Sequence, residues 1–173
     1  MAPMNVVVVG GGVGALELIL GLRKLAEDRT RITLIAPDQD FRYRPAAVAV
    51  PYGQGAVYGF PLADVARAAA ADLVQTTVVE VDPRARRVRT ADGQEFPYDA
   101  VVIACGARRQ PVIDGAIPFR GEEDIPAMDG LLEELGDGRV RSVAFALPRG
   151  ASWALPLYEL ALLTATHLAR TFS

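Results

Sequence analysis

The sequence predicts an α/β fold in which a parallel sheet carries a three-stranded antiparallel insertion. Two apolar runs, residues 6–9 and 31–36, flank a segment with helical periodicity, which is the order of a βαβ unit. A strand-rich segment at residues 78–96, with a tight turn at Asp92-Gly93, predicts the insertion. Of the 173 residues, 51% are apolar, and this share suits strands that are buried on both faces.

The first strand meets the first helix at three consecutive glycines, in the stretch NVVVVGGGVGALELILGLRKL. Gly10 permits the tight turn, Gly12 lets a pyrophosphate approach the backbone, and the small Ala15 lets the helix pack close to the strand. The free amides of the first helical turn, at the positive end of the helix dipole, suit phosphate oxygens. The pattern is the G-x-G-x-x-A variant of a dinucleotide-binding turn. It predicts a Rossmann-like domain that binds either a nicotinamide dinucleotide or FAD.

The first helix is expected from residue 13 to about residue 28, and the second strand at residues 31–36. In such units an acidic side chain about 20 positions beyond the glycines usually binds the ribose hydroxyls. Ala36 occupies the expected place at the end of the strand, and Asp38 follows two residues later. Two interpretations stay open for Asp38: it reaches the ribose from the loop, or it is a solvated turn residue.

The later elements are predicted from local patterns along the chain. Residues 39–61 are expected to be a long irregular stretch, and residues 63–71 a short helix. Strands are then expected at residues 78–82, 87–90, 94–96 and 100–104, the last ending at Gly106. Residues 142–147 predict a strand and residues 155–168 a helix, which together would be the first βα unit of a second dinucleotide-binding-like domain.

Composition excludes several classes of function. The net charge is −3 and the basic residues are scattered, so nucleic acid is not an expected partner. The one cysteine, Cys105, excludes an intrachain disulfide and a CxxC metal cluster, and no metal site is predicted. The one histidine, His167, leaves little room for histidine acid–base chemistry, and no catalytic acid or base is assigned. Pro156 and Glu159 interrupt the last apolar stretch, so we expect a cytoplasmic protein without a membrane anchor in these residues.

Residues 5–109 resemble the FAD-dependent pyridine nucleotide–disulfide oxidoreductases, flavoproteins with two dinucleotide-binding domains. The resemblance is carried by GGGVGALE, by the three-stranded excursion with ADG in its hairpin, and by YDAVVIACGAR. The last segment is similar to a family signature that ends in Ala-Thr-Gly-Ala, with Cys105 at the Thr position. The sequence is most similar to the branch of sulfide:quinone reductases, flavocytochrome sulfide dehydrogenases and type II NADH dehydrogenases.

The resemblance implies FAD as the cofactor and assigns residues to it. The pyrophosphate falls to the glycine turn, namely Gly10, Gly12, Val13, Gly14 and Ala15. Arg44 beside Pro45 would lie near the flavin, and the backbone of Val78 would hold the adenine. Ala104, Cys105 and Gly106 would run past the cofactor, and Arg120 would face the flavin from the connection to a second domain. Ala36 stands where the family has its acidic ribose ligand.

The resemblance further implies an oxidoreductase that passes two electrons through flavin to a quinone, a heme or a similar acceptor, with NAD(P)H as one candidate donor. The cysteine pair of the disulfide reductases is absent, and Ser152 stands where the sulfide branch carries a cysteine. Sulfide oxidation through a cysteine persulfide is therefore disfavoured, because it needs a thiolate. Cys105, at the end of an apolar strand, is expected to be buried and inert.

The expected organisation is an FAD-binding domain at residues 1–118, a connection at 119–138, and the start of an incomplete second Rossmann-like domain at 139–173. We therefore expect the N-terminal portion of a longer flavoprotein or a shortened relative, catalytically incomplete alone and peripheral to the membrane at full length. The helix at 155–168 would leave an apolar face exposed and drive self-association. Two alternatives remain: an NAD(P)-dependent oxidoreductase with a single Rossmann site, and a non-catalytic flavoprotein-like scaffold.

Overall fold

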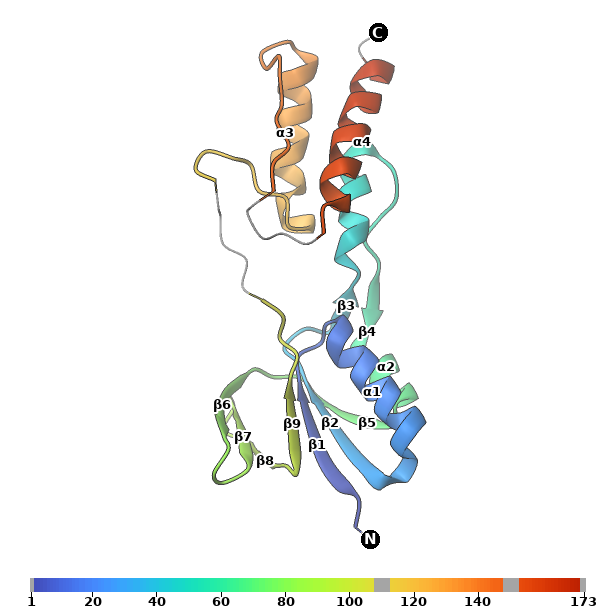
Figure 1. The fold of residues 1–173 in the computed structure, drawn as a ribbon, viewed down its shortest axis with the longest axis vertical. Coiled ribbons are helices and arrows are strands. Elements are labelled where there is room, and N and C mark those ends of the chain that lie inside the picture. The colour runs from blue at the N-terminus through green and yellow to red at the C-terminus, as the bar shows by residue number, and fades with distance from the viewer. Residues whose placement is uncertain (1, 108–112, 148–152, 172–173) are drawn as a thin grey trace. The chain divides into compact units, whose positions relative to one another are not determined.

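The computed structural model describes residues 2–107, 113–147 and 153–171 (Figure 1). The chain divides into two compact units. The first comprises Met1–Arg42 and Gly59–Ala107, and the second comprises Tyr43–Tyr58 and Arg108–Ser173. The predicted boundaries at residues 118 and 138 stay a prediction.

A four-stranded parallel sheet is the centre of the first unit. Its order is β5-β2-β1-β9, with β1 at Met4–Val9, β2 at Thr30–Ile35, β5 at Ala71–Val74 and β9 at Ala100–Ile103. β1 is an inner strand, and its last four valines are all buried. The continuous apolar run in the sequence therefore reflects a strand that is covered on both faces.

Helices and the antiparallel insertion cover the two faces of this sheet (Figure 1). α1 (Val13–Ala26) and α2 (Leu62–Ala68) pack on one face, where Ile19 and Leu62 join the core formed by Val8 and Leu34. On the other face, Val88 and Tyr98 pack against the alternate side chains of β1. The predicted α/β class, with its parallel sheet and its insertion, is confirmed.

The insertion is a three-stranded antiparallel sheet in the order β6-β7-β8, made of β6 (Val78–Asp82), β7 (Arg87–Thr90) and β8 (Glu95–Pro97). These bounds agree with the predicted strands to within one residue. The register shifts between Val78 and Glu80, so that Val79 forms a bulge in the edge strand β6.

Two local predictions in the first unit are wrong. The helix expected at residues 63–71 ends at Ala68, because Ala71 begins β5, a parallel partner of β2 that the sequence pattern did not predict. The run of alanines favours helix locally, but pairing with a strand nearly 40 residues earlier in the chain decides the structure. Residues 39–61 are also not irregular. They contain the antiparallel pair β3 (Asp40–Arg42) and β4 (Gly59–Pro61), and between them the 3₁₀ helix η2 (Arg44–Tyr52).

In the second unit, η2 packs with two helices, α3 (Ile125–Gly136) and α4 (Leu155–Thr171). Their shared core is built from Val48 and Tyr52 of η2, Met128 and Leu132 of α3, and Leu160 of α4. α4 confirms the predicted helix. The strand predicted at residues 142–147 is absent, and α3 was not predicted. The described part of this unit holds no other strand with which residues 142–147 could pair, and a lone strand cannot satisfy its backbone groups.

Candidate functional site

Gly10 joins the carboxyl ends of three neighbouring strands. Its φ of +119° lies in a region that side chains rarely adopt, and a Cβ placed there would lie 2.4 Å from the carbonyl oxygen of Ala104. Its amide donates to the carbonyl of Ile35 at 2.8 Å, and the amide of Ala104 donates to the carbonyl of Val9 at 2.7 Å. β1, β2 and β9 therefore meet at the turn, and the role of Gly10 in the tight turn is confirmed by its geometry.

Gly11 was not predicted as a site residue, yet the fold depends on it. A Cβ at Gly11 would lie 2.8 Å from Cδ1 of Leu62 and 3.2 Å from the Cβ of Ala36. The side chain of Leu62, which is fully buried, therefore fills the space that the missing Cβ leaves. The only signal in the sequence was that the run has a glycine at residue 11, between the two glycines of the pattern. Nothing nearby in the sequence indicated that Leu62 would fill the space beside it.

Gly12 differs from Gly10 and Gly11, because neither the backbone conformation nor the packing requires a glycine at this position. Its backbone angles, φ −87° and ψ −179°, are extended and open to any residue, and a Cβ would meet no atom within 4 Å. Gly14, in the first turn of α1, likewise faces open space. The room beside Gly12 is of the kind that a closely approaching ligand would use.

The start of α1 presents free hydrogen-bond donors. No side chain caps Gly12, and no acidic residue lies in the first turn. The carbonyl of Gly12 accepts from the amides of Ala15 and Leu16, whereas the amides of Gly12, Val13 and Gly14 have no partner among the described residues. Three free donors at the positive end of a helix dipole suit an anion such as a phosphate.

The two residues predicted near the ribose, Ala36 and Asp38, differ in their exposure to solvent. Ala36 is fully buried, and its amide donates to the carbonyl of Val74 at 3.1 Å. It cannot bind a ribose hydroxyl through its side chain, since it has no polar atom there. Asp38 is exposed on the loop that follows β2, so of the two predicted residues only Asp38 carries an accessible carboxylate.

The end of β9 corrects one prediction. Cys105 is exposed, whereas it was expected to be buried, because β9 ends at Ile103 and Cys105 lies beyond the core. Its Sγ lies 3.5 Å from the carbonyl oxygen of Val9. Gly106 follows with φ +71°. The predicted group Ala104, Cys105 and Gly106 thus borders the glycine turn.

Val78 begins β6 and packs, half-buried, against the core that includes Val9 and Ile35. These two residues are the last of β1 and β2, so Val78 lies at the carboxyl edge of the parallel sheet. Of the predicted site residues, the structure gathers those of the first unit at this edge.

The remaining predicted site residues belong to the second unit. Arg44 is exposed at the start of η2, and Pro45 follows it. Arg120 is held by the buried carboxylate of Asp124, with Nη2 2.7 Å from Oδ1 and Nε 3.0 Å from Oδ2. This carboxylate raises the pKa of the Arg120 guanidinium through the hydrogen bonds and its charge. The predicted place of these three residues beside a flavin stays a prediction, and Ser152 lies outside the described residues.

The site offers binding groups rather than reactive ones. The first unit contains no histidine, and its one cysteine has no second thiol with which to form a disulfide. Among the described residues, no three His, Cys, Asp or Glu side chains gather as a metal ion would need. No helix in the same residues is both long and apolar enough to cross a bilayer.

Comparison with known proteins places the chain among redox enzymes. The sequence model of the pyridine nucleotide-disulphide oxidoreductase family matches residues 4–143. A sulfide-quinone reductase of Aquifex aeolicus is 33% identical over 106 residues, which make up 60% of this chain and 24% of that protein. A nitric oxide reductase FlRd-NAD(+) reductase of Aeromonas hydrophila is 29% identical over 141 residues, 75% of this chain and 35% of that protein.

A solved structure extends the similarity over nearly the whole chain. The X-ray structure of the sulfide:quinone oxidoreductase of Aquifex aeolicus aligns with a TM-score of 0.78 at 28% identity. The alignment covers 96% of this chain and 40% of that one. The chain thus spans less than half the length of each of these relatives.

Proposed function

Because the chain belongs to the pyridine nucleotide-disulphide oxidoreductase family, we propose that it binds FAD through the turn between β1 and α1 and serves flavin-dependent oxidation and reduction. The observation that carries this proposal is the open space at Gly12, together with the free amides beside it. A glycine that neither backbone angles nor packing requires is explained by a ligand that lies against it.

Each residue of the turn has a distinct task in this proposal. The amides of Gly12, Val13 and Gly14 donate to the pyrophosphate oxygens, while Gly10 and Ala15 shape the turn and the packing of α1. When bound, the flavin supplies two-electron chemistry, and the chain supplies binding and orientation. The family suggests further contacts at the border of the site, from Asp38, Arg44, Pro45, Val78, Ala104, Cys105, Gly106 and Arg120.

The proposal also concerns the electron donor and the electron acceptor of the flavin. The names of two relatives, sulfide-quinone reductase and FlRd-NAD(+) reductase, support a quinone or a redox protein as acceptor and a nicotinamide as donor. A persulfide route is not proposed, because Ser152 stands where the sulfide branch carries a cysteine. We also propose a place at the membrane surface, where a quinone such as the one in the name of the sulfide-quinone reductase would be met.

Titration of the purified chain with FAD and, separately, with NADH tests the proposal. We expect FAD to bind and its fluorescence to be quenched, and NADH alone not to compete for the same turn. Binding of NADH with no binding of FAD would instead support a single nicotinamide site. Binding of neither would refute the proposal for this chain.

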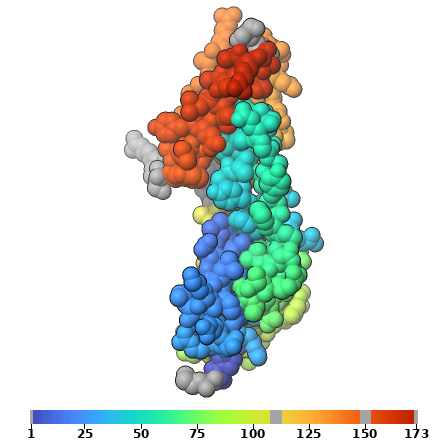
Figure 2. Space-filling model, turned by 90° about the vertical axis from the view of Figure 1, so that its right-hand side faces the viewer, coloured from blue at the N-terminus to red at the C-terminus, as the bar shows by residue number. Residues whose placement is uncertain are grey.

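We also propose that α4 associates with a second copy of the chain. Leu155, Tyr158 and Leu162 are 59%, 61% and 69% exposed and follow one another at helical spacings of three and four residues. The surface of α4 is open to view in Figure 2, where the helix is orange-red to red. Light scattering over a concentration series tests this proposal. A strict monomer at high concentration would refute it, and Leu162→Glu is expected to weaken an observed dimer.

A further inference from the structure

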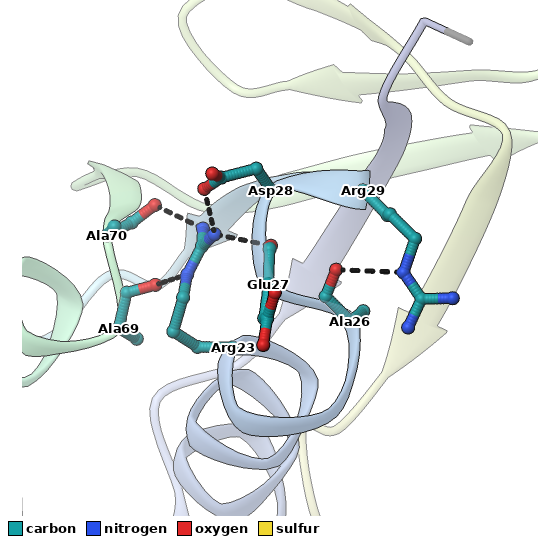
Figure 3. Close-up of polar contacts among 7 residues, drawn as sticks. All are labelled: Arg23, Ala26, Glu27, Asp28, Arg29, Ala69 and Ala70. Atoms are coloured by element: carbon teal, nitrogen blue, oxygen red, sulfur yellow. Dashed lines mark hydrogen bonds and ion pairs between the residues drawn. The ribbon is translucent and has the colours of Figure 1, made fainter.

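Arg23 bonds the ends of two helices with one guanidinium group. Nε donates to the carbonyl of Ala69 at 2.7 Å, Nη2 donates to the carbonyl of Ala70 at 2.9 Å, and Nη1 donates to the carbonyl of Glu27 (Figure 3). Nη1 also lies 3.6 Å from a carboxylate oxygen of Asp28, and the Arg23 side chain is 23% exposed.

The accepting carbonyls follow the last residues of α1 and α2. α1 ends at Ala26, so Glu27 is its C-cap, and α2 ends at Ala68, so Ala69 and Ala70 follow it directly. Glu27 and Ala70 have φ of 49° and 46°, a left-handed conformation that is costly for residues other than glycine. A cation placed there satisfies carbonyls of both helix ends and complements both dipoles.

α2 is fixed at its other end to the glycine turn. Its first residue, Leu62, fills the space beside Gly11, and the Leu62 amide donates to the carbonyl of Gln39 at 2.9 Å. Leu62 lies beside Gly11 and Ala69 lies beside Arg23, so α1 and α2 run in the same direction along one face of the sheet (Figure 1). Leu62 joins them where they begin, and Arg23 joins them where they end.

From this arrangement we infer that Arg23 is a positioning residue for the phosphate-binding turn. It fixes α1 against α2, and α2 in turn holds the glycine turn through Leu62. Arg23 lies roughly 17 Å along the helix axis from Gly12, at 1.5 Å per residue, so it cannot touch a ligand there. The role of Arg23 toward FAD rests on the proposed function, but its role in holding the turn does not.

Arg29 provides a matched control. Its guanidinium donates to the carbonyl of Ala26 at 3.2 Å (Figure 3) and to the carbonyl of Leu25 at 2.7 Å, both at the end of α1. No bond from Arg29 to α2 is seen among the described residues. A second control, Asp99→Ala, removes the carboxylate that accepts from the amide of Asn5 at 2.8 Å, at the opposite end of β1. This substitution is expected to lower stability without removing a contact of either helix.

The first measurement uses the full chain without FAD. Hydrogen exchange is followed at Gly10, Ala15 and Leu16, whose amides bond carbonyls of the turn and of β2. We expect these amides to exchange at least fivefold faster in Arg23→Gln than in Arg29→Gln or Asp99→Ala. The three variants are compared at the same interval below the Tm of each, so that a difference in global stability does not account for the result. Equal exchange in the three variants would overturn the inference, whether or not the chain binds FAD.

The second measurement is the Kd for FAD by fluorescence quenching. If one hydrogen bond from a backbone amide to a charged phosphate oxygen is partly lost, the Kd of Arg23→Gln should be about tenfold weaker than that of the wild-type chain. The Kd of each of the two controls should change by less than about twofold. Arg23→Lys keeps the positive charge but loses the planar guanidinium with its several N–H donors. This variant should fold and give an intermediate Kd. A Kd for Arg23→Gln equal to that of Arg29→Gln would overturn the inference. Wild-type protein that does not bind FAD would refute the proposed function instead, and the exchange data would still decide the role of Arg23.

Discussion

Replacing Gly12 with alanine separates ligand binding from stability. The extended backbone at Gly12 accepts an alanine, and its Cβ would meet no protein atom within 4 Å. The free energy of unfolding should therefore stay the same or rise by about 0.4–1 kcal/mol, because alanine restricts the unfolded chain. The methyl group would occupy the space through which the pyrophosphate approaches. Loss of one hydrogen bond to a charged oxygen costs about 1.5–3 kcal/mol, so the Kd for FAD should weaken by roughly 10- to 100-fold.

Gly21→Ala is the control for this substitution. Gly21 lies in α1, a Cβ there would also meet no atom within 4 Å, and the residue is not among those assigned to the ligand. Alanine in a helix should stabilise the chain by up to about 1 kcal/mol and leave the Kd nearly unchanged. The assay pairs FAD fluorescence quenching with urea unfolding. A Gly12→Ala chain that binds FAD as tightly as the Gly21→Ala chain would refute the placement of the pyrophosphate at this turn.

Three further predictions concern single residues. Gly10→Ala should cost at least about 3 kcal/mol in urea unfolding, since strain at positive φ adds to a backbone clash, and a loss under 1 kcal/mol would contradict this. Burial raises the pKa of Tyr52 above its usual 10.0, so the folded chain holds this proton more tightly than the unfolded chain does. Its contribution is therefore complete below pH 10 and lost as the pH rises further, and Tyr52→Phe should flatten the alkaline loss of Tm; an unchanged alkaline curve would count against it. Cys105 should react with a thiol reagent in the folded chain and be protected by FAD, and equal labelling with and without FAD would oppose its place beside the cofactor.

The parts of the fold that depend on nearby residues could be predicted from the sequence. The glycine turn combines strand, turn and helix within about 20 residues, and the hairpins of the insertion are set by short turns such as Asp92-Gly93. These elements appear in the structure within one or two residues of the predicted bounds. The family resemblance drawn from the same stretches is confirmed by the family match.

The parts that depend on distant partners could not be predicted. β5 is short and follows an alanine run, and only its pairing with β2 makes it a strand. Gly11 needs no side chain because Leu62, 51 residues later, fills the space beside it. The exposure of Cys105 depends on how the chain continues beyond β9, which ends at Ile103.

η2 is fixed by residues far from it in the sequence, and this has consequences for Arg44. The hydroxyl of Tyr52 lies 2.8 Å from Oγ1 of Thr164 in α4, and Val48 and Tyr52 pack against Leu160. The 3₁₀ geometry of η2 is weak by itself, since its hydrogen bonds are poorly aligned. The conformation of the segment that carries Arg44 therefore depends on packing against α4.

Leu160→Ala tests this dependence. Leu160 is 8% exposed, and removing a buried leucine side chain costs about 2–5 kcal/mol. Part of that cost should appear as release of η2, so chymotrypsin should cleave after Tyr52 at least tenfold faster under native conditions. Leu162→Ala is the control, because Leu162 lies two residues further along α4 and is 69% exposed. If both variants resist cleavage as the wild-type chain does, η2 holds its conformation without the side chain of Leu160, and the dependence of the Arg44 segment on α4 is refuted.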